Sequence, residues 1–144
     1  MKAMEMEQQK VHLIRLEKGE DLLLGILEYI KAKNIMAGYL TGIGALGKGK
    51  IGFFDTKDLR YLHIPFKEVE LLACTGNIAR NKNTQEPIAH IHIVLGDKDG
   101  KCIGGHLVEG TVSVTAEIYI VETKPGVFRT KDEDTGLFLL NPKN

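Results

Sequence analysis

The tightest constraint on the fold lies in residues 87–109, where an apolar, β-branched run is followed by a short turn-forming stretch and a returning run. The stretch Asp97-Lys98-Asp99-Gly100 follows the first run directly, and this pattern predicts a β-hairpin. Side chains alternate across a strand, so His90 and His92 share one face of the first run. A third histidine, His106, lies on the returning run. The predicted hairpin therefore carries three of the five histidines of the chain.

The length of the turn decides which face His106 occupies. A three-residue loop with Gly100 in the left-handed conformation places His106 directly opposite His92, with their Cβ atoms about 5 Å apart. A two-residue loop places His106 opposite Ile93 instead and turns it to the other face. The spacing permits a three-histidine cluster, and both registers remain open at this level.

One helix and many strands are predicted for the rest of the chain. Residues 20–33 carry an apolar stripe with helical spacing, preceded by acidic and followed by basic residues. Strand patterns occur at residues 10–16, 35–47, 48–55, 59–65, 69–78, 87–96, 101–109, 111–122 and 137–140. Such a chain, without alternation of strands and helices, is expected to be α+β, with one main helix and a mostly antiparallel sheet of about seven or eight strands. We expect this sheet to be curled or folded into a sandwich.

The glycine-rich segment Gly42–Gly47 matches the spacing G-x-G-x-x-G. A dinucleotide-binding loop needs that motif to open a helix after a strand. Here the residues that follow, 48–55, are glycine-broken and strand-like. We therefore interpret the segment as a bend or bulge between strands.

The length of 144 residues fits one domain, residues 1–144, with the polar residues 1–9 expected to be loose. Cys74 and Cys102 are too few for a disulfide framework, and we expect both to be small buried apolar residues in a reducing, cytoplasmic compartment. No apolar run is long enough to span a membrane, and the N-terminus lacks the apolar segment of a signal peptide. The 19 basic residues balance the 19 acidic residues, which disfavours a nucleic-acid binder driven by net charge.

The histidine hairpin is the leading candidate site. Three neutral imidazoles with an open fourth position form a known zinc arrangement, so His90, His92 and His106 are candidate metal ligands. The alternative is a structural role in the sheet or at a subunit interface. Glu117 is the best nearby carboxylate if strand 111–122 pairs with 101–109, as a hydrogen-bond partner of a histidine or as a general base. Imidazole also suits other divalent transition metals, so zinc is less firmly indicated than the site.

Basic residues near these segments are candidates for anion or DNA contact. Arg80 and Lys82 lie in a hydrophilic stretch just before the histidine strand, and Lys48 and Lys50 lie in the glycine-rich region. For Arg80 and Lys82 a solvated loop is the simpler interpretation, and an anion-binding rim near the histidine face is the functional one. Binding through such residues should be weak, sequence-tolerant and sensitive to salt.

The ordered combination of these motifs resembles the plant-and-prokaryote (PPC) domain family over roughly residues 10–140. The resemblance rests on Gly19-Glu20-Asp21 at the helix start, the Gly42–Gly47 bend, the segment 70–78, and above all His90-Ile91-His92 followed by Gly104-Gly105-His106. It implies a mostly antiparallel sheet with one main helix, assembled as a homotrimer. Plant members bind AT-rich DNA with an attached AT-hook, but this sequence has no Arg-Gly-Arg-Pro core of such a hook.

The expected function is therefore that of a stand-alone, homotrimeric PPC-domain protein that binds DNA or regulatory partners and carries a three-histidine metal site. Two other classes remain open: a metal-dependent enzyme, and a small-molecule-binding module. The histidine cluster favours these two, whereas the family resemblance favours the first. No motif in the sequence identifies a substrate.

Overall fold

The structure, a computed structural model, describes residues 1–142. Within these residues the chain forms one helix and seven strands. They follow one another as β1 (Glu7–Glu17), α1 (Leu22–Ala32), β2 (Gly38–Asp55), β3 (Arg60–Asn81), β4 (Pro87–Gly96), β5 (Cys102–Lys124), β6 (Phe128–Lys131) and β7 (Phe138–Asn141). The predicted α+β fold with a single main helix is confirmed. β1 begins at Glu7, inside the segment that was expected to be loose.

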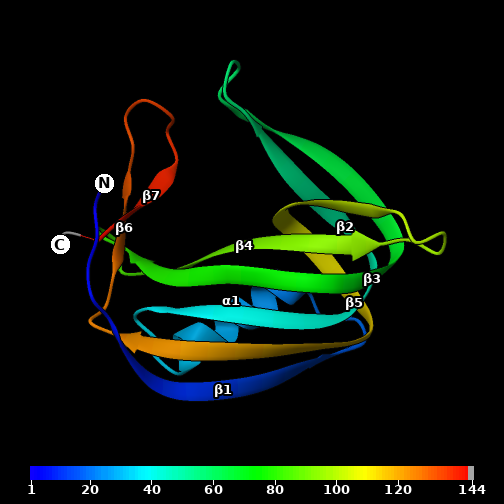
Figure 1. Cartoon of the computed structure of the whole chain (residues 1–144), viewed down its shortest axis with the longest axis horizontal. Helices are drawn as coiled ribbons and strands as arrows, with labels where there is room; N and C mark the ends of the chain where they lie inside the picture. The colour runs from blue at the N-terminus through cyan, green and yellow to red at the C-terminus, as the bar shows by residue number, and fades with distance from the viewer. Residues whose placement is uncertain (143–144) are drawn as a thin grey trace.

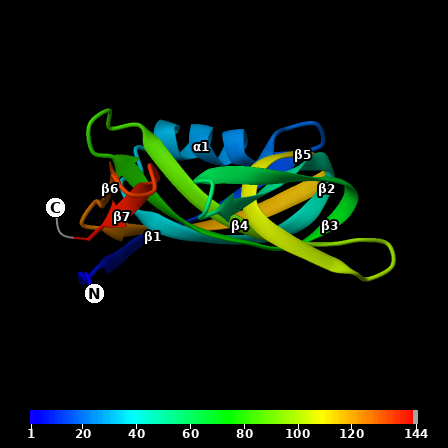
Figure 2. The ribbon, with the colours of Figure 1, turned by 90° about the horizontal axis from the view of Figure 1, so that it is seen from above.

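All seven strands belong to one sheet in the order β1-β5-β2-β3-β6-β7, and β4 pairs with both β3 and β5. Every pairing is antiparallel except that of β3 with β6. Because β4 joins β3 to β5 and β2 also joins them, these four strands form a closed circuit of hydrogen-bonded neighbours. The sheet is therefore strongly curled, as expected, and α1 lies across one of its faces (Figures 1 and 2).

The helix is fixed at its start by Asp21, which caps it and ties it to the sheet. One carboxylate oxygen of Asp21 accepts a hydrogen bond from the backbone N of Leu24 at 2.9 Å, and the other accepts from the backbone N of Gly110 at 3.1 Å. The buried face of the helix covers the sheet, and each side chain fully buried there contributes roughly 1.5–3 kcal/mol to folding. This face consists of Leu22, Ile26 and Ile30.

The strands are longer than their sequence patterns suggested. Segments 59–65 and 69–78 merge into β3, and the Gly42–Gly47 segment lies inside β2, with shifts of register rather than a break. Close packing explains a glycine here, because a Cβ atom at Gly44 would collide with the backbone O of Thr115 on β5. The backbone continues as a strand and opens no helix, so a dinucleotide-binding loop is excluded at this position.

The ends of the sheet differ in shape. The β2–β3 hairpin projects away from the body, and the short strands β6 and β7 lie together at one end of the molecule (Figure 1). The strand predicted at 137–140 is β7. Within residues 1–142, the helix is too short to cross a membrane.

Candidate metal centre

The histidine hairpin adopts the three-residue loop. The backbone N of Asp97 donates to the backbone O of Lys101 at 2.9 Å, and Gly100 has a φ of +76°. This turn sets the register between β4 and β5, in which His92 pairs with His106. His90 is on the same face of β4, two residues before His92. Of the two predicted registers, the structure therefore contains the one that brings all three histidines together.

The three imidazole rings lie close enough to share one ion. Their centroids are 5.0 Å apart for His90 and His92, 5.2 Å for His90 and His106, and 5.7 Å for His92 and His106. One ligand nitrogen from each ring can be chosen so that all three lie within 4.8 Å of one another. The Nε2 atoms of His90 and His92 are 3.2 Å apart. Tetrahedral zinc with Zn–N bonds of about 2.0–2.1 Å places its nitrogens about 3.3 Å apart, so the separation of the His90 and His92 nitrogens matches the spacing of two zinc ligands.

The surroundings disfavour the charged form of two of these rings. Burial lowers the pKa of His106 from 6.5 to about 4, with a smaller contribution from the positive charges of His90, His92 and Arg129. Burial also lowers the pKa of His90, again helped by Arg129 and His92. The Nδ1 atom of His106 is buried and has no hydrogen-bond partner among the described residues. Because a metal binds only the neutral ring, these conditions favour ligation.

Arg129, on β6, is part of the same site, and the sequence patterns did not reveal it. Its Nη2 donates to Oδ1 of Asn77 at 2.6 Å, and its Nη1 donates to the backbone O of Phe138 at 2.7 Å. Asn77 in turn pairs with His90 across the β3–β4 ladder. The parallel pairing of β3 with β6 brings Arg129 to this place, and no local sequence signal announces such a long-range contact.

A cavity of about 200 Å³ opens beside the cluster. Its polar wall consists of His90, His106, Arg129 and Tyr61, whose ring centroid lies 5.2 Å from that of His106. None of the described residues that line it is acidic. The cavity is therefore a compartment next to the candidate metal ligands whose walls carry positive charge and no negative charge.

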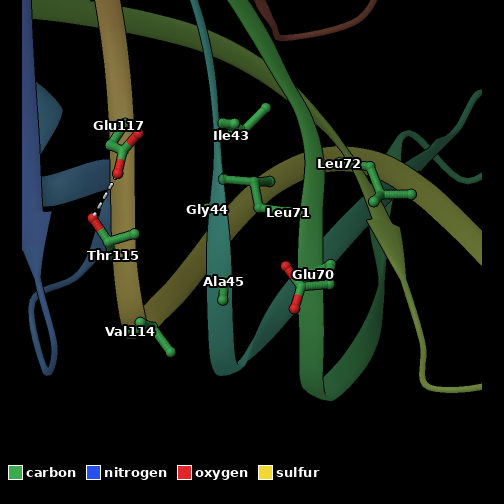
Figure 3. A pocket seen from close by; sticks show the side chains of 9 residues that line it. All are labelled: Ile43, Gly44, Ala45, Glu70, Leu71, Leu72, Val114, Thr115 and Glu117. Carbon is green, nitrogen blue, oxygen red and sulfur yellow. Dashed lines mark hydrogen bonds between the residues drawn. The ribbon is translucent and has the colours of Figure 1, made fainter.

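Glu117 lies elsewhere. Segments 101–109 and 111–122 are parts of the single strand β5 and do not pair with each other, so the arrangement that would bring Glu117 to the histidines does not occur. Glu117 instead pairs with Arg15 and Ile43. There it accepts a hydrogen bond from Oγ1 of Thr115 at 3.4 Å and lines a separate groove of about 400 Å³ (Figure 3).

The four basic candidates are not gathered at the histidine site, and one of them is buried. Arg80 is only 5% exposed, and its guanidinium donates to the backbone O of Ile35 at 3.0 Å and that of Gln85 at 3.2 Å. Lys48 and Lys50 are exposed on β2, where Lys50 forms an ion pair with Glu109 at 3.0 Å. The fourth, Lys82, is exposed just after β3.

The two cysteines have different environments. Cys74 is fully buried in the core, and burial raises the pKa of its thiol to about 12. Cys102 is exposed, so the expectation that both are buried is wrong for this residue. Cys102 opens β5 directly after the turn, where the hairpin projects beyond the core.

The chain is similar to known proteins over almost its whole length. Residues 3–124 match the Plants and Prokaryotes Conserved (PCC) domain family. The bifunctional protein GlmU of Synechococcus sp. (strain JA-3-3Ab) is 27% identical over 136 residues, which cover 92% of this chain and 20% of that protein. The chain therefore spans about a fifth of the length of this curated relative.

Three solved structures are also similar. The metal-containing protein AF0104 from Archaeoglobus fulgidus and a plant- and prokaryote-conserved (PPC) protein from Pyrococcus horikoshii are each 35% identical, with a TM-score of 0.89. The matches cover 98% of this chain and 99% and 97% of those chains. A protein from Ralstonia eutropha JMP134, provisionally described as DNA-binding, is 25% identical with a TM-score of 0.80, over 90% of this chain and 89% of that one.

Proposed function

This chain belongs to the Plants and Prokaryotes Conserved (PCC) domain family, and from that premise we propose that it is a homotrimeric metalloprotein centred on His90, His92 and His106. The observation that carries the proposal is the convergence of three ligand nitrogens within 4.8 Å on one face of a hairpin. The metal-containing protein from Archaeoglobus fulgidus, which has the same fold, supports it. All seven strands lie in one sheet, in keeping with one domain over residues 1–144.

Zinc is the ion we propose, although other divalent transition metals also bind imidazole. Three neutral imidazoles leave one position of a tetrahedral zinc open to water or a ligand, and zinc lowers the pKa of a bound water toward neutrality. The cavity that holds Arg129 and Tyr61 is lined by two of the three proposed ligands, His90 and His106, so a ligand there would lie close to the metal position. This arrangement favours a small-molecule-binding module or a metal-dependent enzyme over a purely structural cluster.

The proposed assembly explains an apolar surface that one chain leaves exposed. On β1, β2 and β5 the side chains that point away from α1 include several large apolar ones, and such a surface on a protein this small marks a contact with another chain. Exposed members of this surface are Val11, Leu13, Tyr39, Ile43, Val114 and Tyr119. The threefold order itself rests on the resemblance to the PPC family.

DNA binding is the second candidate function, favoured by the provisional description of the Ralstonia protein. The exposed lysines Lys48, Lys50 and Lys82 can contact phosphates, whereas the buried Arg80 cannot. Lys48 lies directly opposite Lys67, and a bound anion would offset the repulsion of two like charges at such a position. With no excess of basic residues, binding should be weak, sequence-tolerant and lost as salt is raised. The free thiols Cys74 and Cys102 are in keeping with a cytoplasmic location.

Metal analysis of purified, tag-free protein tests the principal proposal. We expect zinc-incubated wild type to retain about one zinc per chain, with a thermal midpoint that falls when chelator is added. His92→Ala and His106→Ala should retain no stoichiometric zinc, whereas His63→Ala, which removes an exposed histidine outside the cluster, should behave as wild type. A wild type without zinc whose midpoint ignores the chelator would show that the cluster is structural.

A further inference from the structure

Arg129 is hydrogen-bonded in place beside the candidate metal ligands, and one of its donor nitrogens has no partner among the described residues. Two of its three guanidinium nitrogens donate to Asn77 and to the backbone of Phe138. The third, Nε, is buried without a hydrogen-bond partner among the described residues. Burying an unpaired charged donor is costly, so a buried guanidinium with a free donor is normally completed by a further acceptor. No side chain of the described cavity wall supplies one.

The charge of the cavity also indicates that it binds an acceptor with negative charge. Arg129 is one permanent positive charge, and a divalent ion at the three histidines adds two more. The described walls contain no carboxylate that could balance them. A positively charged, partly buried cavity selects anions, and the planar guanidinium of an arginine matches the two-oxygen geometry of a carboxylate.

The other walls and the size of the cavity limit the rest of the ligand. Ile88, Leu137, Phe138 and Leu139 form much of the apolar part of the cavity wall. The volume of about 200 Å³ is small for a ligand pocket. The cavity therefore suits a small molecule with a short apolar body.

We propose that this cavity binds a small monocarboxylic acid, with its carboxylate between the three-histidine metal position and the guanidinium of Arg129, and its apolar body against β7. The inference rests on the proposed metal site, because the metal supplies the second partner of the carboxylate. Arg129 is then a ligand-binding residue, and the apolar wall limits the length of the acid.

Calorimetric titration of zinc-loaded protein with butanoate and with butanamide tests this proposal. The two probes have nearly the same size and shape but differ in charge. Wild type should bind butanoate at least tenfold more tightly than butanamide. Arg129→Gln should lose at least tenfold in butanoate affinity while its zinc content stays at the wild-type value. Lys131→Gln, which removes an exposed charge from the same strand, should remain within twofold of wild type.

The outcomes separate the two proposals. Zinc-loaded wild type that binds both probes equally, or neither, overturns the carboxylate site and leaves the metal site standing. Wild type that takes up no zinc overturns the metal site, and the carboxylate site falls with it. If Arg129→Gln fails to fold, the comparison of butanoate with butanamide in wild type decides the question alone.

Discussion

His92 lies directly across the β4–β5 hairpin from His106, and the centroids of the two rings are 5.7 Å apart. This relationship depends on a turn at the far end of the hairpin. The loop that ends at Gly100 fixes the register, and a slip of one residue would turn His106 to the opposite face. The candidate site is thus specified by backbone conformation several residues away from its side chains.

The first prediction concerns this turn. Gly100 has a φ of +76° and an open space where a Cβ would lie, so substitution acts through backbone strain alone. Gly100→Ala should lower the free energy of unfolding by about 1 kcal/mol, measured by denaturant titration. Lys98→Ala, in the same turn, should change it by less than about 0.5 kcal/mol. Equal effects of the two substitutions would contradict a requirement for the left-handed conformation.

The hairpin shows how far the sequence could predict the site. The pattern of apolar runs and the Asp-Gly turn restricted His106 to two registers, and the structure contains one of them. Arg129 could not be found this way, because its position follows from the parallel β3–β6 pairing, which has no local signal. The expected position of Glu117 near the histidines was wrong for a related reason. It required segments 101–109 and 111–122 to pair with each other, but they form one continuous strand.

The burial of single residues was also difficult to predict from the sequence. Arg80 lies in a hydrophilic stretch of the sequence, but it is buried where the segment after the helix places the backbone O of Ile35 within hydrogen-bond distance of its guanidinium. Cys102 has an apolar sequence context, yet it lies on a projecting hairpin. The helix and most strands were predictable because their patterns are local, whereas these environments are created by distant segments.

The second prediction concerns pH in the metal-free protein. The pKa of His106 is about 4 in the fold, below its ordinary value of 6.5. The folded state therefore binds the proton less readily than the unfolded state, and the stability present above pH 6.5 should decrease as pH falls toward 4. Denaturant midpoints between pH 6.5 and 5 should decline less in His106→Asn than in wild type. The exposed-site variant His63→Asn should retain the wild-type decline, and an unchanged slope in His106→Asn would contradict the prediction.

The third prediction concerns the two thiols. Cys102 is exposed, whereas Cys74 is buried with its pKa raised to about 12. Because the thiolate is the reactive form, a thiol reagent at pH 8 should modify one cysteine per native chain and both in denaturant. Peptide mass spectrometry should locate the native modification at Cys102, and Cys102→Ser should abolish it. Rapid native labelling of Cys74 would show that the core around it opens easily.

The fourth prediction concerns assembly. Leu13 is 60% exposed on the sheet face, and Leu24 is 59% exposed on the helix. If the sheet face is the subunit contact, Leu13→Glu buries a charge there and should convert a trimer of about 48 kDa into a 16.0 kDa monomer in light scattering. Leu24→Glu, an equally exposed site on the helix, should leave the assembly intact. A monomeric wild type at micromolar concentration would refute the trimer.

The last prediction separates Arg80 from Lys82, two neighbouring cations of similar sequence context. The guanidinium of Arg80 donates to the backbone O of Ile35, the backbone O of Gln85 and, at 3.4 Å, Oδ1 of Asn34. Arg80→Gln leaves buried acceptors unpaired, so it should lower the free energy of unfolding by about 2–4 kcal/mol, measured by denaturant titration.

Lys82→Gln removes an exposed charge and should leave stability within about 0.5 kcal/mol of wild type. Its effect should be confined to DNA, where losing one phosphate contact weakens binding alike for all sequences and lowers the salt dependence of affinity by about one unit of slope. Fluorescence anisotropy with two unrelated duplexes at several salt concentrations measures both effects. If Lys82→Gln binds as wild type at every salt concentration, Lys82 makes no phosphate contact, and only Lys48 and Lys50 of the proposed contacts remain.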